Sequence, residues 1–118
     1  MTDKKYVFAN WKMYLDNDES AVLALEFAGE FKNLSENIKM AVFPSALSFL
    51  SVVKSLQDTQ IGVGAQNVYW VEKGGYTGEV SAHMYKSVGA EYVLVGHSER
   101  RHLFHETNHQ VREKVEAI

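Results

Sequence analysis

The chain has no cysteine and only one proline among its 118 residues. The absence of cysteine excludes disulfides, Cys-ligated zinc and thiol nucleophiles. No apolar run approaches the ~18 residues needed to span a bilayer, and the segment from Met1 to Ala9 is too short for a signal-peptide core. The formal net charge is −3, so the chain lacks the excess of positive charge that would favour binding to nucleic acid or to an anionic membrane surface. We therefore expect a soluble, cytoplasmic protein that binds neither nucleic acid nor membrane.

The remaining composition is that of an ordinary globular protein. Hydrophobic residues make up 46% of the chain and charged residues 23%. This length supports one domain with a sizeable core, and a second core would not fit comfortably. We expect a single domain over residues 1–118.

Short, continuously apolar segments recur along the chain, and helical patterns separate them. The predicted strands are Tyr6–Ala9, Met40–Phe43, Ile61–Ala65 and Tyr92–Val95. Unbroken apolar character is typical of strands covered on both faces. Alternation of strands with helices predicts an α/β fold with parallel strands and right-handed crossovers. The pattern fits a small doubly wound sheet or part of a barrel, and periodicity does not choose between them.

Each predicted helix has a candidate start, and the first, second and last also have an apolar face. Asn17–Ser20 offers N-cap candidates for the first helix, Pro44 and Ser45 begin the second, the third covers Ser81–Val88, and Thr107 or Asn108 caps the last. The apolar face of the first helix is predicted to be Val22, Leu25, Phe27, Ala28 and Phe31. That of the second is Phe49, Leu50, Val53 and Leu56, and that of the last is Val111, Val115 and Ile118.

Polar residues follow three of the predicted strands, and ligands of parallel α/β folds bind at those carboxyl ends. Lys12, His97 and Glu99 on one rim would suit an anionic substrate and proton transfers. Each also has a plain alternative: a solvated cation, a structural imidazole and a helix-start carboxylate. A helical turn beginning at Ser98 would disfavour imidazolium and leave His97 neutral, able to donate to a carbonyl oxygen.

Two other patterns carry less weight. His102, His105 and His109 have helix-compatible spacing, but no nearby Asp ligand at fixed geometry accompanies them, so we expect solvated side chains and no metal. The segment Gly62–Val63–Gly64 has no third glycine at the offset of a dinucleotide fingerprint, and we reject that interpretation.

Four sequence blocks point to one family. Asn10–Met13 (NWKM), Gly64–Asn67 (GAQN), Gly74–Ser81 (GGYTGEVS) and Tyr92–Arg101 (YVLVGHSERR) closely resemble triosephosphate isomerases, in order and spacing. The resemblance implies half of a TIM (β/α)8 barrel and interconversion of dihydroxyacetone phosphate and glyceraldehyde 3-phosphate without a cofactor, in glycolysis and gluconeogenesis. It also implies site residues: Asn10 and Lys12 for substrate binding, and His97, Lys12 and Glu99 for catalysis, with His97 as the electrophile and Glu99 placed near the lysine.

The resemblance further implies a dimer. In relatives the Gln66–Glu79 loop, with Tyr76, Thr77, Gly78 and Glu79, reaches a neighbouring subunit, where Thr77 lies beside that subunit's Asn10 and His97. Open edges at the first and fourth strands also favour a homodimer.

A family member has ~250 residues, and this chain covers slightly under half of that. The family's glutamate base, lid and phosphate loop lie in the other half, so we expect no isomerase activity from these 118 residues alone. Two alternatives remain open: a non-catalytic, self-associating half-barrel, or one half of a two-chain isomerase.

Overall fold

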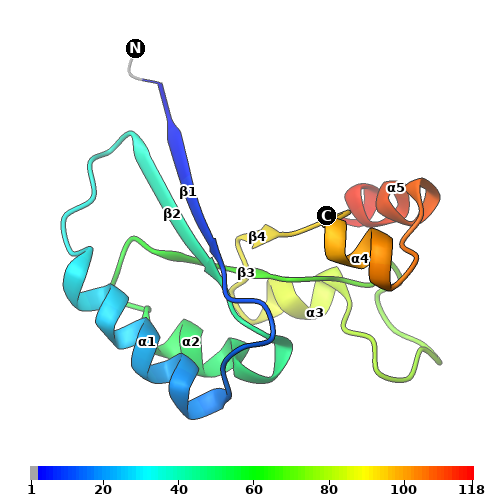
Figure 1. The fold of residues 1–118 in the computed structure, drawn as a ribbon, viewed down its shortest axis with the longest axis horizontal. Helices are drawn as coiled ribbons and strands as arrows, with labels where there is room; N and C mark the ends of the chain where they lie inside the picture. Colours follow the sequence, from blue (N-terminus) through cyan, green and yellow to red (C-terminus); the bar gives the residue numbers. More distant parts are fainter. Residues whose placement is uncertain (1–2) are drawn as a thin grey trace.

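The computed structural model describes residues 3–118, and it has parallel strands alternating with helices (Figure 1). The strands are β1 (Lys5–Asn10), β2 (Ile38–Phe43), β3 (Gly62–Ala65) and β4 (Tyr92–Val93), paired in the order β1-β2-β3-β4. The predicted α/β class, the alternation of strands with helices along the chain and the parallel pairing of the strands are confirmed. Met1 and Thr2, which begin the segment considered as a targeting signal, lie outside the described residues.

The helices are α1 (Asn17–Glu30), a short 3-10 helix η1 (Ala46–Ser48), α2 (Phe49–Ser55), α3 (Ala82–Ser87), α4 (Ser98–Leu103) and α5 (Asn108–Ala117). None of the helices within residues 3–118 has the length and apolarity that crossing a membrane requires. Thr107 caps α5 as predicted, whereas α1 is capped by Asp16, one residue before the predicted candidates.

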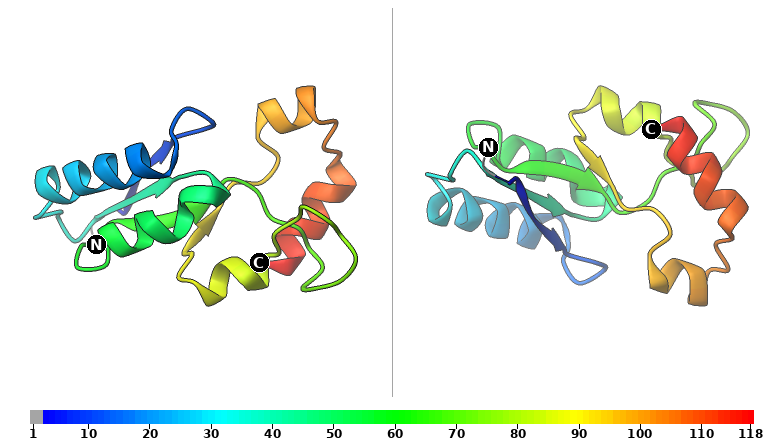
Figure 2. Two further views of the ribbon diagram at one scale, coloured as in Figure 1. Left: turned by 90° about the horizontal axis from the view of Figure 1, so that it is seen from below. Right: turned by 90° about the horizontal axis from the view of Figure 1, so that it is seen from above.

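The sheet curls, and α1 and α2 pack side by side against its outer face (Figures 1 and 2). Alternate residues of the central strands, including Met40, Val42, Val63 and Ala65, form the hydrophobic core with α2. A curled parallel sheet with these helices on one face is half of a barrel rather than a doubly wound sheet. This resolves the alternative that periodicity left open.

The inner, concave face of the sheet carries aromatic rings. Phe8 lies 5.4 Å from Phe43 and 5.0 Å from Tyr92, measured between ring centroids. Phe43 is buried beneath this cluster, and Gly62 and Gly64 of β3 leave the space that the rings of Tyr92 and Phe43 fill. The ring contact of Phe8 with Tyr92 joins the two edge strands across the concave face.

Several predicted burial patterns are wrong. β1 is not covered on both faces: Tyr6, Val7 and Phe8 are 57%, 48% and 47% exposed, because β1 has a paired strand on one side only. In α1, Ser20 and Ala24 are buried, since small side chains allow close packing there, and Val22 and Leu25 are exposed.

The other helices show similar differences. In α2, Val52 is buried in the core and Leu50 is exposed. In α5, Lys114 is the buried residue, because it pairs with a buried glutamate, while Val115 and Ile118 are exposed. β4 ends at Val93 rather than Val95, and Leu94 adds one more backbone hydrogen bond to Ala65, at 2.9 Å.

Candidate functional site

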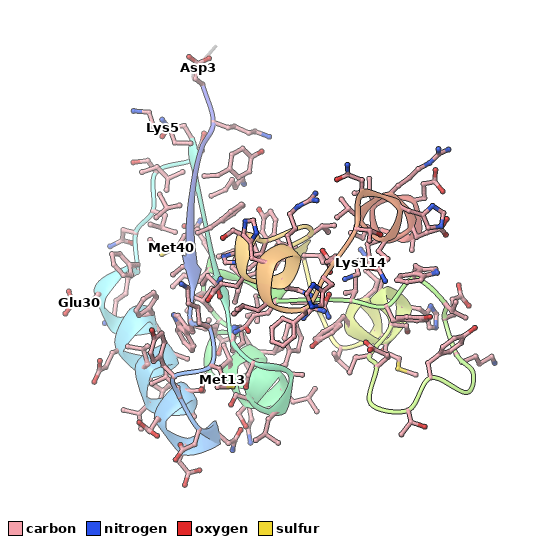
Figure 3. The ribbon with its side chains drawn as sticks, turned by 45° about the vertical axis from the view of Figure 1, so that its right-hand side comes forward. Asp3, Lys5, Met13, Glu30, Met40 and Lys114 are labelled. Atoms are coloured by element: carbon pink, nitrogen blue, oxygen red, sulfur yellow. The ribbon has the colours of Figure 1, made fainter. Side chains whose placement is uncertain are left out.

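Two loops at the carboxyl ends of the edge strands bring three predicted site residues together. Met13, in the loop after β1, lies at the opposite end of that strand from Lys5 (Figure 3). In the same loop, Lys12 places its Nζ 3.2 Å from Oε1 of Glu99, in the first turn of α4. Both side chains are about half exposed, so the pair is open to an anion arriving from solvent.

His97 joins this pair as the N-cap residue of α4. Its Nδ1 lies 3.1 Å from the backbone nitrogen of Glu99 and accepts that N–H, while the Oε1 atom of the same glutamate is 3.6 Å away, beyond hydrogen-bond distance. A ring nitrogen that accepts a hydrogen bond carries no proton. The geometry therefore favours a neutral imidazole with its proton on Nε2, and this N–H is left to donate to a ligand.

The backbone of the Lys12 turn is held by side chains. Lys12 has a left-handed conformation, with φ of 53°. Its N–H donates to Oδ1 of Asn10 at 2.9 Å, and its carbonyl accepts from Nε2 of Gln66 at 2.8 Å. Asn10 thus supports the lysine turn from the end of β1, and Gln66, predicted as the first residue of a dimer loop, contacts that turn within its own chain.

The rest of the predicted dimer loop lies away from this cluster (Figures 1 and 2). Its base is closed by backbone hydrogen bonds from Tyr69 N to Val80 O at 2.8 Å and from Ala82 N to Tyr69 O at 3.1 Å. The ring of Tyr69 stacks on Trp70 at 4.2 Å and contacts Tyr76 at 4.6 Å. Beyond these rings Thr77, Gly78 and Glu79 are exposed.

A buried ionic network that the sequence does not predict lies behind the site. Glu106 accepts hydrogen bonds from the backbone of Gly96 at 2.8 Å, from Arg100 Nε at 2.9 Å and from the ammonium of Lys114. The same ammonium donates to Oδ1 of Asn67 at 2.7 Å, at the end of β3. The network fixes the loop that carries His97.

Electrostatics in this network favour the charged carboxylate. Burial raises the pKa of Glu106, but hydrogen bonds from Lys114 and Arg100, the charge of Lys114 and the hydrogen bond from the Gly96 amide outweigh it, so the pKa is lowered from its ordinary value. No local pattern identifies such a pair, because Glu106 lies in a loop and Lys114 looks like a solvated lysine on an exposed helix. The only available signal is a lysine eight positions after a glutamate, which is too common to be specific.

The histidine and glycine patterns of the sequence add no residue to this site. Within residues 3–118 there is no cluster of three or more His, Asp or Glu side chains arranged to hold a metal. The glycines of Gly62–Val63–Gly64 make room for aromatic rings inside the sheet. A cavity of about 280 Å³ lies between Trp70, α3 and β4, and its walls include none of Lys12, His97 and Glu99.

Comparisons with known proteins agree on one family. The family model described as triosephosphate isomerase matches residues 5–118. The chain is 41% identical over 117 residues to a triosephosphate isomerase of Dictyoglomus turgidum, covering 97% of this chain and 45% of the relative. It is 43% identical over 113 residues to that of Cytophaga hutchinsonii (95% and 45%) and 43% identical over 117 residues to that of Bdellovibrio bacteriovorus (98% and 47%). The chain thus spans about half the length of these curated relatives.

Proposed function

This chain belongs to the triosephosphate isomerase family, and from that membership we propose that it carries the lysine and histidine part of a site that interconverts dihydroxyacetone phosphate and glyceraldehyde 3-phosphate. The observation that supports the proposal is the meeting of Lys12 and His97 at one carboxylate, Glu99. The reaction moves a proton between neighbouring carbons and needs no cofactor. We propose that this reaction belongs to glycolysis and gluconeogenesis and takes place in the cytoplasm.

Each residue has a role that its geometry suits. Lys12 attracts the phosphate and the carbonyl oxygen of the substrate, and Glu99 holds its ammonium in place. His97 donates from Nε2 to the carbonyl oxygen, which stabilises the negative charge that develops there as an enediolate forms. The same imidazole then moves protons between the two enediolate oxygens.

The first proton must be taken from carbon by a separate base. Glu99 is a poor candidate because its carboxylate is already paired with Lys12. We therefore expect a polypeptide of these 118 residues alone to be inactive, and the base to come from the part of the family's length that this sequence does not cover.

Complementation tests the proposal. The 118-residue polypeptide is mixed with the unmatched remainder of the Dictyoglomus turgidum relative, and isomerisation is followed in a coupled assay free of host enzyme. We expect turnover from the mixture and none from either part. His97→Gln should lower that turnover by roughly 10²–10⁴-fold, whereas His102→Gln, the same change at an exposed histidine of α4, should leave it unchanged.

Two results would contradict the proposal. One is turnover by the 118-residue polypeptide alone that His97→Gln abolishes, because it would show that the chain contains its own base. The other is turnover of the mixture that survives His97→Gln, because His97 would then have no part in the reaction.

One observation favours a second, non-catalytic role as a self-associating half-barrel. Among residues 3–118, nothing pairs with the outer edge of β1, and the Tyr6 and Phe8 side chains on its concave face are about half exposed. Such edges pair readily with another chain. We propose that a second copy of this chain pairs with the β1 edge. The alternative partner is a separately encoded C-terminal half, as in a two-chain isomerase, and the complementation experiment would reveal it.

A further inference from the structure

The lysine at the centre of the proposed site has an unfavourable backbone. Lys12 is left-handed, with φ of 53°. For a residue with a Cβ this conformation costs of order 1–2 kcal/mol, and strained residues persist only where the surroundings hold them. The Lys12 turn therefore needs a specific restraint.

Gln66 supplies a restraint from a distant part of the chain. Its side-chain nitrogen donates to the carbonyl of Lys12 at 2.8 Å and to the carbonyl of Phe43 at 2.9 Å. The NH₂ group of an amide has two hydrogens, so one side chain satisfies both acceptors. Phe43 is buried at the end of β2, and its carbonyl also accepts from Trp11 N at 3.1 Å. The amide therefore ties the lysine turn to the rigid centre of the sheet.

The geometry points to Gln66 as a positioning residue for Lys12: its amide holds the left-handed turn that sends Nζ toward Glu99. This inference rests on the proposed function for the role of Lys12, and it separates Gln66 from the exposed loop that follows it. Asparagine would be one methylene too short to reach both carbonyls, and glutamate would present only acceptors to them.

The test replaces the amide and observes Lys12. In the 118-residue polypeptide, Gln66→Met keeps a side chain of similar length and removes both donors. NMR scalar couplings that report the sign of φ should show Lys12 leaving the left-handed region. Inorganic phosphate, titrated against the Lys12 amide shift, should bind about tenfold more weakly. Gln57→Met, the same change at an exposed glutamine, should alter neither measurement.

A double variant separates positioning from general structural support. Glycine adopts φ > 0 without penalty, so the turn should persist in Lys12→Gly even when the amide is missing. The loss of unfolding free energy caused by Gln66→Met should therefore be larger on the Lys12→Gly background, because Lys12 recovers backbone strain when it leaves the left-handed region and glycine has no such strain to recover. Equal losses on both backgrounds, or a Lys12 that stays left-handed in Gln66→Met, would overturn the inference.

If Gln66→Met does not fold, Gln66→Asn takes its place, because it retains a donor on a shorter arm and predicts the same change in φ. The sign of φ is read without any ligand, so it tests Gln66 even if the unaltered polypeptide fails to bind phosphate. That failure would count against the anion site of the proposed function and not against the role of Gln66.

Discussion

Gly64 shows at the scale of one residue how the concave face is shaped. A Cβ built on Gly64 would overlap the ring of Phe43, approaching its Cδ1 atom to 2.6 Å. Phe43 is itself almost fully buried, so its ring has little freedom to move aside. Glycine is therefore needed at position 64 because the Phe43 ring occupies the place of a side chain, and not because the backbone conformation is unusual.

We predict that Gly64→Ala destabilises the fold by about 1–3 kcal/mol, the usual cost of overpacking a core. Denaturant unfolding followed by circular dichroism measures the change. Gly29→Ala is the matched control, since nothing lies within 4 Å of a Cβ at that position in α1, and alanine there should stabilise by about 0.5–1 kcal/mol. Equal effects of the two substitutions would show that the Phe43 ring does not occupy the space beside Gly64.

Residues at strand ends were the easiest to predict from the sequence. Lys12 and His97 lie two and four positions after the ends of β1 and β4, so parallel pairing alone places them on one rim. Gln66 is also at a strand end, but the direction of its amide depends on the path of the β1 loop 54 positions away. The Glu106–Lys114 pair was not predicted, because loop and helix must both form before the two side chains meet.

At the scale of elements, α4 and α5 are attached differently from α1 and α2. None of the core residues lies in α4 or α5, among the residues that the structure describes. Their buried contacts are instead the polar network of Glu106, Lys114 and Asn67. The face of α5 was therefore mispredicted from apolar periodicity: an ion pair, and not an apolar stripe, fixes its orientation.

Glu106→Gln should destabilise this attachment by about 3 kcal/mol, because it leaves the buried Lys114 without an anionic partner. Glu116→Gln is the control: it removes an exposed pair with Arg112 in the same helix and should cost under about 0.5 kcal/mol. Amide hydrogen exchange in α5, together with denaturant unfolding, measures both. Protection in α5 that is the same in the two variants would contradict the importance of the buried pair.

The same pair gives stability a pH dependence. The folded-state pKa of Glu106 is lowered below its ordinary value of 4.5, so the unfolded chain binds the proton first. The stabilisation is complete above that value and is lost as the pH falls through the folded-state pKa. Unfolding free energy measured from pH 6 downward should therefore decline less steeply in Glu106→Gln than in the unaltered chain. Parallel declines would show that another carboxylate controls the acid sensitivity.

The whole molecule is more open than a closed domain of its length. Its radius of gyration is 14.8 Å, against about 13.5 Å expected for 118 residues. The expected open edges at the first and fourth strands are present, since β1 and β4 end the sheet. The inner face of the sheet is open only in part: Tyr6 and Phe8 are about half exposed, whereas Phe43 is covered by neighbouring rings.

We predict that the polypeptide self-associates, as a homodimer, through β1 and the concave face. Sedimentation velocity at micromolar concentration should show a dimer, and Tyr6→Lys should shift it toward monomer, since lysine on an edge strand opposes pairing. Val22→Lys is the matched control, because both side chains are 57% exposed and Val22 lies on α1, away from the concave face. A monomer in the unaltered chain, or equal effects of the two lysines, would contradict this interface.

We predict that His97 is neutral and carries its ring proton on Nε2. Long-range ¹H–¹⁵N NMR of the histidine rings in the 118-residue polypeptide, recorded near pH 7.5 and assigned with His97→Gln, measures this tautomer directly. We expect a protonated Nε2 and an unprotonated, hydrogen-bonded Nδ1, as the 3.1 Å contact with Glu99 N requires. A proton on Nδ1, or on both nitrogens, would contradict it.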